Sequence, residues 1–235
     1  MKEDEKTAFR DNMTAGETTA ALLYLPIHVL LMPWLLEKLY YTGLVDAVMI
    51  NVIYYAVAVL FLMTALWKFF RRSFDALCDY GLAVVLDILK AYGTMLLCNL
   101  GVSLVLVLVG RTGNPNNEAV WTIAGEDPGK MAAAAVFLAP IAEEAMFRGG
   151  LFGILRRRSR IAAYAVSAAM FAFYHLWSYL AEDATAWIYL IQYLPAGILL
   201  ARCYEKTSSI WASIFLHMTV NGISLLALSM IGGML

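Results

Sequence analysis

Two adjacent carboxylates, Glu143 and Glu144, stand inside an otherwise apolar segment of the chain, residues 139–149. Glu144 and Arg148 are four residues apart, so on a helix they share one face and can form an ion pair. Glu143 points about 100° away around the same helix and has no helical partner of this kind. Ionisable groups in a membrane are costly and usually face a bundle interior or a water-filled cavity. Glu143 is therefore the carboxylate left free for chemistry.

Further polar side chains recur in apolar runs of the second half. His175 lies in one run, and His217 and Asn221 lie in another, four residues apart and hence on one helix face. Counting residues from the nearest basic positions puts Glu143 and His217 at similar depths near the middle of the membrane. The same count puts His175 nearer the outer surface, which is at odds with a shared site.

A carboxylate and two imidazoles in a dry pocket can hydrolyse an amide. Glu143 and His175 can hold and deprotonate a water molecule, because both are side chains that accept a proton near neutral pH. His217 and Asn221 carry the donors that a tetrahedral oxyanion needs. Glu144 and Arg148 would support the site. The sequence has no Gly-x-Ser-x-Gly motif, and Ser167 and Cys203 are weak candidates for a nucleophile.

Simpler explanations exist for each residue taken alone. A Glu144–Arg148 pair is more often structural than catalytic. A lone intramembrane histidine such as His28 serves a packing hydrogen bond about as often as a function, and we interpret His28 as structural. The whole set of two glutamates, an arginine, two histidines and an asparagine across three apolar runs is harder to attribute to packing.

The composition predicts an all-α, polytopic bundle of transmembrane helices. Hydrophobic residues make up 62% of the 235 residues and charged residues 15%, against about 25% charged residues in soluble domains. The apolar runs are long and unbroken, which disfavours a β-barrel. The net charge of −1 and the lack of a basic patch argue against nucleic-acid binding. Three scattered cysteines form no zinc or disulfide pattern, and we predict no cofactor and no metal.

Seven apolar runs are each near the ~20 residues that cross a bilayer. They lie near residues 20–36, 44–67, 80–109, 131–155, 161–180, 187–201 and 210–231. Splitting the third run would give eight spans. Residues 111–129 are predicted to be a loop. We divide the chain into residues 1–129, a polar tail with accessory transmembrane helices, and residues 130–235, a catalytic helical core.

The distribution of basic residues predicts the orientation. With a cytoplasmic N-terminus, three basic clusters all fall on the cytoplasmic side: Lys68/Arg71/Arg72, Arg156–Arg160 and Arg202/Lys206. The opposite loops are mostly acidic. We expect a multi-pass protein of the plasma membrane, in contact with lipid, whose N-terminus is cytoplasmic.

Three motifs together resemble those of one protein family. Glu143-Glu144-x-x-x-Arg148, Phe171-x-x-x-His175 and His217-x-x-x-Asn221 are similar, in this order, to the CAAX protease and bacteriocin-processing family, also called the Abi family. The resemblance covers residues 131–226, and the first ~130 residues match no family that we can name.

The resemblance implies a type II CAAX prenyl protease-like, glutamic-type intramembrane endopeptidase that acts on a peptide or membrane-protein substrate. It assigns the catalytic water to Glu143 and His175, the oxyanion to His217 and Asn221, and support to Glu144 and Arg148. Members either trim prenylated CAAX proteins or are linked to bacteriocin processing and immunity. Two alternatives stay open: a non-catalytic immunity or peptide-binding scaffold, and a zinc-dependent membrane protease, for which the chain lacks a His-Glu-x-x-His motif.

Overall fold

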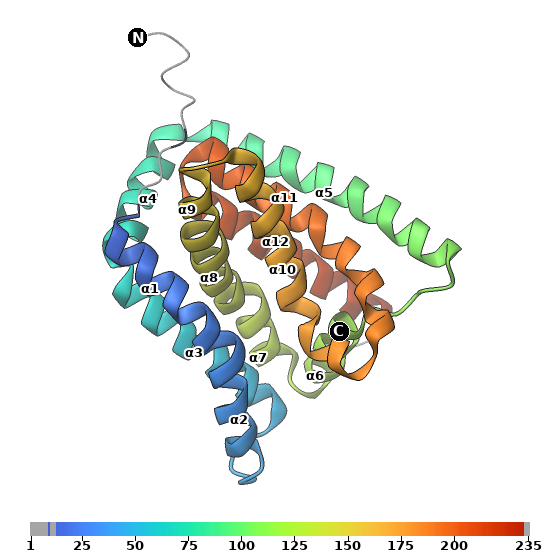
Figure 1. Cartoon of the computed structure of the whole chain (residues 1–235). Coiled ribbons are helices and arrows are strands. Elements are labelled where there is room, and N and C mark those ends of the chain that lie inside the picture. Colours follow the sequence, from blue (N-terminus) through green and yellow to red (C-terminus); the bar gives the residue numbers. More distant parts are fainter. Residues whose placement is uncertain (1–8, 10–12, 233–235) are drawn as a thin grey trace, which may run out of the picture.

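The computed structural model describes residue 9 and residues 13–232 of the chain. Within this part every regular element is a helix, which confirms the prediction of an all-α polytopic bundle. The chain is an integral multi-pass membrane protein. Figure 1 shows the helices gathered side by side around one central helical run, residues 128–156.

The first half forms an outer wall. One helical run contains α1 (Ala15–Pro26), η2 (Ile27–Leu31) and α2 (Met32–Tyr40), and it is followed by α3 (Ala47–Ala65), α4 (Trp67–Tyr80) and α5 (Leu82–Leu108). The side chain of Thr14 caps α1 together with Glu17, as the Thr-x-x-Glu pattern suggests. The π-helical turn η2 directly follows Pro26 in the chain. The missing N–H of Pro26 interrupts the α-helical hydrogen-bond ladder.

The second half holds the centre of the bundle. The central run comprises α7 (Pro128–Ala132), η3 (Ala133–Leu138), α8 (Ala139–Glu144), η4 (Ala145–Phe152) and α9 (Gly153–Arg156). It is followed by α10 (Arg160–Glu182), η5 (Ala184–Tyr189), α11 (Leu190–Thr207) and α12 (Ile210–Gly232). The elements η3 and η4 are π-helical, and both flank the short helix that carries the two glutamates.

The number of spans differs from the sequence-based count of seven or eight. Six helices of the described chain are long and apolar enough to cross a membrane: residues 15–40, 47–65, 82–108, 160–182, 184–207 and 210–227. The predicted span 131–155 falls on the central run. Every 18-residue stretch of that run contains at least three charged residues, among them Glu143 and Glu144, so the run is less apolar than the six helices.

The predicted loop 111–129 is wrong, because it contains α6 (Pro115–Glu126). The side chain of Asn114 accepts hydrogen bonds from the backbone N–H groups of Asn116 and Asn117, and Pro115 occupies the first helical turn. An asparagine cap followed by proline is a helix-start signal that outweighs the turn propensity of the same residues.

Small residues allow the helices around the site to approach closely. A Cβ atom on Gly197 of α11 would lie 2.8 Å from the Cα atom of Ala168 in α10. A Cβ atom on Gly149 in η4 would lie 2.6 Å from the methyl carbon of Met13 and 3.4 Å from Phe69. The small-residue pattern at Gly197 and Ala201 thus works as such patterns do in membranes, by bringing helix backbones together.

We predict that Gly197→Ala destabilises the bundle by about 1–3 kcal/mol, because the new methyl group would overlap the backbone of α10. The measurement is thermal unfolding of the purified protein in detergent. Gly101→Ala is the matched control, since nothing lies within 4 Å of a Cβ atom there. Equal melting temperatures for the two variants would contradict close packing of α10 on α11.

Candidate active site

The two adjacent glutamates of α8 face different surroundings. Both side chains are buried, Glu143 at 3% exposure and Glu144 at 0%. Glu143 lines a cavity of about 530 Å³, whereas Glu144 does not. Consecutive helical residues point about 100° apart. Glu143 therefore faces the cavity, while Glu144 points into the packed interior.

Three side chains form hydrogen bonds or ion pairs with Glu144. Its Oε1 atom lies 2.9 Å from Nη1 of Arg148 and 2.9 Å from Nδ1 of His217. Its Oε2 atom accepts a hydrogen bond of 2.5 Å from the hydroxyl group of Ser213. The pair predicted from the spacing of Glu144 and Arg148 is therefore present and fully buried.

Arg148 has further contacts that hold it in place. Its Nη2 atom donates to the carbonyl oxygen of Gly197 at 3.4 Å, and its guanidinium carbon lies 4.1 Å from the centre of the Phe171 ring. A buried charge needs a counter-charge and hydrogen bonds to offset its desolvation. Arg148 has both, together with an aromatic face.

His217 is oriented by Glu144. A carboxylate accepts hydrogen bonds, so Nδ1 of His217 carries the hydrogen of their 2.9 Å contact. The other ring nitrogen, Nε2, then faces Glu143, at 3.9 Å from its Oε2 atom. Glu144 thus decides which nitrogen of His217 is presented to the neighbouring carboxylate.

His175 is oriented in the same way by the backbone. Its Nδ1 atom donates to the carbonyl oxygen of Phe171 at 2.8 Å, and its Nε2 atom lies 3.8 Å from Oε2 of Glu143. Residue counting had put His175 at a different depth. That count assumes helices perpendicular to the membrane, and the packing of α10 against the central run brings His175 level with Glu143.

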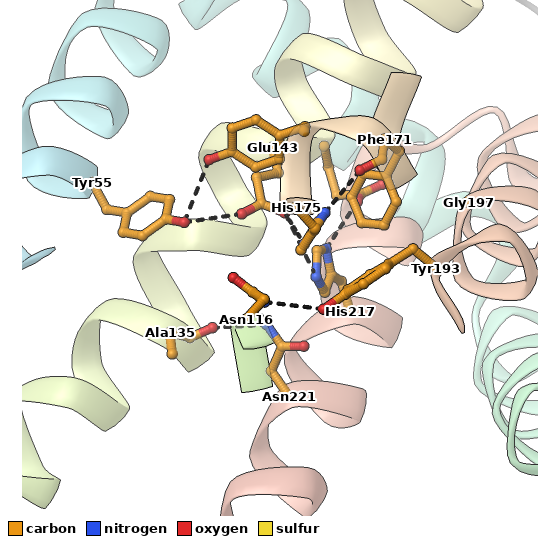
Figure 2. Close-up of polar contacts among 12 residues, drawn as sticks. Tyr55, Asn116, Ala135, Glu143, Phe171, His175, Tyr193, Gly197, His217 and Asn221 are labelled. Carbon is orange, nitrogen blue, oxygen red and sulfur yellow. Dashed lines mark hydrogen bonds and ion pairs between the residues drawn. The ribbon is translucent and has the colours of Figure 1, made fainter. Parts of the chain in front are cut away.

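The three groups converge on one point that the protein leaves open. Oε2 of Glu143 is buried and accepts no hydrogen bond within the described chain. The two imidazole nitrogens stand 3.8 and 3.9 Å away from it, beyond direct hydrogen-bonding distance. Figure 2 shows the two rings turned toward this carboxylate. Polar groups at such distances are typically bridged by water.

Asn221 lies one helical turn beyond His217 on α12 and lines the same cavity. Its Nδ2 atom donates at 2.9 Å to the carbonyl oxygen of Ala135 in η3 (Figure 2). This bond uses one of the two amide hydrogens. The other hydrogen stays available, on the helix face that Asn221 shares with His217.

The first half of the chain supplies polar partners that sequence spacing did not reveal. The hydroxyl group of Tyr55 in α3 donates to Oε1 of Glu143 at 3.3 Å (Figure 2). Tyr55 also lies 3.4 Å from the hydroxyl oxygen of Tyr174, which in turn lies 3.2 Å from Nε2 of His28. The available signal was that Asn51, Tyr54 and Tyr55, three polar side chains inside an apolar run, share one helix face.

His28 is therefore packed as expected but is not isolated. It is fully buried, and its ring stacks on that of Tyr54 with 4.1 Å between the ring centres. Tyr54 also donates to the backbone carbonyl oxygen of His28 at 3.1 Å. Through the hydroxyl groups of Tyr174 in α10 and Tyr55 in α3, this histidine of η2 is linked to Glu143 in α8.

The two weak nucleophile candidates stay outside the cavity. Ser167 is buried and donates to the carbonyl oxygen of Phe147 at 3.3 Å, and Cys203 is buried as well. Neither belongs to the cavity lining.

The donor set does not fit a metal site. In the part of the chain that the structure describes, no three histidine, cysteine, aspartate or glutamate side chains are grouped so that they could hold an ion. The chain also has no His-Glu-x-x-His motif, and the amide of Asn221 suits an oxyanion site better than a zinc site. We therefore derive no chemical step through zinc.

Part of the chain matches a known protein family. Residues 127–223 match the family model described as Type II CAAX prenyl endopeptidase Rce1-like. This stretch contains all six predicted site residues, and the match confirms the resemblance to the CAAX protease family. No curated protein and no solved structure matches the chain.

We predict that Arg148→Met destabilises the protein by about 3–5 kcal/mol, because Glu144 would remain as an uncompensated buried charge. Thermal unfolding in detergent measures the effect. Arg71→Met, at an exposed position of α4, is the control. The double variant Glu144→Gln/Arg148→Met removes both charges and should recover part of the loss. A double variant that is less stable than Arg148→Met would contradict this explanation.

Proposed function

We propose, from the Type II CAAX prenyl endopeptidase Rce1-like family to which residues 127–223 belong, that the chain is an intramembrane endopeptidase whose Glu143 activates a water molecule. The observation that carries the proposal is the unpartnered Oε2 atom of Glu143, faced at 3.8 and 3.9 Å by the Nε2 atoms of two histidines. Each histidine is held in this orientation through its other nitrogen.

In the first step, water attacks the scissile carbonyl carbon. The ionised Glu143 takes one proton from the water as its oxygen forms the new bond to carbon. His175, whose Nδ1–H is used by Phe171, presents an Nε2 lone pair that accepts the second hydrogen of the water. Together the two groups fix the attacking oxygen in a site from which bulk solvent is excluded, where positioning itself lowers the barrier.

The tetrahedral oxyanion is stabilised by His217 and Asn221. The buried cluster contains the carboxylates of Glu143 and Glu144 and the guanidinium of Arg148, so its net charge is −1. One additional proton makes the cluster neutral. With this proton on Nε2, His217 donates to the oxyanion while Glu144 balances the imidazolium charge through Nδ1. The second amide hydrogen of Asn221 adds a neutral donor.

In the last step, the C–N bond breaks. The proton that Glu143 took from water passes to the leaving nitrogen, so the products are a carboxyl group and an amine, and the site returns to its starting charge. Tyr55 is a positioning residue in this scheme. It holds Oε1 of Glu143, so that Oε2 is the atom that faces the histidines.

We expect Glu143→Gln to lower peptide hydrolysis by roughly 10²–10⁴-fold, the usual contribution of a general base, while the protein stays folded in the membrane. The measurement is comparative proteomics of membrane peptides in cells that express the wild type or the variant, which also identifies the substrate. Glu182→Gln, at an exposed position, is the control. Unchanged cleavage by Glu143→Gln would overturn the mechanism, and a biological activity that survives it would favour the scaffold alternative.

For Tyr55→Phe we expect kcat to fall roughly 10- to 100-fold with KM and melting temperature nearly unchanged, since a hydrogen bond to a charged group contributes about 1.5–3 kcal/mol. Steady-state kinetics on the substrate identified by proteomics provide the test. Tyr54→Phe is the matched control, because this variant loses a hydrogen bond to the backbone of His28 and none to Glu143. A Tyr55→Phe variant that changes only melting temperature would show a purely structural role.

A further inference from the structure

The two ends of the bundle carry opposite charge. At one end lie three basic clusters: Lys68/Arg71/Arg72 in the first turns of α4, Arg156–Arg160 around the turn from α9 to α10, and Arg202/Lys206 in the last turns of α11. At the other end, near α2, α6 and the last turn of α10, acidic residues prevail: Asp46, Glu118, Glu126, Asp127, Glu182 and Asp183. Figure 1 shows α4 and α9 at one end of the molecule and α6 at the other. The positive-inside rule makes the basic end cytoplasmic.

The cavity occupies only the half of the bundle on the α6 side. On α12 its lining begins at His217 and continues toward the C-terminus, and on α10 it begins at Phe171 and continues to Tyr179. On α3 it includes Asn51, Tyr54 and Tyr55, which lie in the first half of that helix, and α6 itself contributes several residues. Glu143 therefore lies at the end of the cavity nearest to the basic clusters, and α6 lines the opposite end, which we take as its mouth.

The path from Glu143 to the basic end is closed by packing. All residues from Ala145 to Gly150 in η4 are buried. Arg148 is fully buried among Glu144, Gly197 and Phe171, and Gly149 packs against Met13 and Phe69 without room for a methyl group. A polypeptide can therefore reach Glu143 through the α6 end and not through the basic end.

The lining also indicates what the cavity can hold. It carries side-chain amides along its length, among them Asn99, Asn116, Asn221 and Gln192, and no lysine or arginine of residues 13–232 lines it. The Oδ1 atom of Asn99 is buried and accepts no hydrogen bond within the described residues. Side-chain amides pair with peptide N–H and C=O groups, whereas a free carboxylate in such a cavity would have no counter-charge.

We infer that the site receives an extended, uncharged stretch of polypeptide from the non-cytoplasmic face of the membrane, through the mouth beside α6, and acts at an internal bond of it rather than next to a free C-terminal carboxylate. Cleavage of this stretch rests on the proposed function, but the direction of access does not. Substrates are then exported peptides, or membrane proteins at the end of a span that faces away from the cytoplasm.

Access is tested by labelling single cysteines in intact cells with a membrane-impermeant maleimide. The background carries Cys78→Ser, Cys98→Ser and Cys203→Ala, and melting temperature checks that it is folded. We expect Asn117→Cys at the mouth and Ser178→Cys in the cavity to react from outside, and Arg158→Cys at the basic end to react only after permeabilisation. Cavity positions that react only from the cytoplasmic side, or from neither side, overturn the inference.

The same labelling repeated in the Glu143→Gln background separates the two proposals, because access does not require catalysis. The form of the substrate is then tested with a library of uncharged synthetic peptides offered as free acids and as C-terminal amides to the reconstituted protein. We expect equal cleavage of the two forms. Loss of cleavage on amidation would overturn recognition of an internal segment. Cleavage that persists undiminished in Glu143→Gln would overturn the proposed function and leave the direction of access standing.

Discussion

The organisation of the site depends on one buried carboxylate, Glu144. It joins Arg148 on its own helical run to His217 and Ser213 on α12, and Arg148 extends the link to the backbone of α11. A charge placed in a protein interior is stable only when counter-charge and hydrogen bonds replace its lost hydration. Because Glu144 takes up these partners, the adjacent Glu143 is left to face the cavity.

The backbone of the central run adapts to this requirement. The short α-helix that carries both glutamates stands between two π-helical stretches, and such stretches are frequent at functional sites because each changes the direction in which later side chains point. One of them, η3, also offers the carbonyl oxygen that holds Asn221. Close contact at Gly149 and Gly197 then lets the surrounding helices pack tightly against the run.

The helices that precede the family match take part in the same site. Glu143 receives its hydroxyl donor from Tyr55 in α3, and the chain of hydroxyl groups continues through Tyr174 to His28. Met13 and Phe69 pack over Gly149 on the other side of the central run. The first half of the chain therefore does more than surround the matched segment, since it supplies a hydroxyl contact to Glu143 and packs against Gly149 of the central run.

The sequence by itself determined the helical membrane class, the Glu144–Arg148 pair and the shared face of His217 and Asn221. These features follow from hydropathy and from helical spacing within a single segment, which are local properties. The contacts of His175 and Tyr55 with Glu143, and the link from Tyr55 through Tyr174 to His28, join different helices. No spacing in the chain encodes how those helices tilt. The two π-helical stretches of the central run escaped prediction because tertiary packing determines them. Helix α6 escaped prediction because its asparagine cap outweighs the turn propensity of the same residues. Only the packed bundle decided that Glu143, His175, His217 and Asn221 line one cavity.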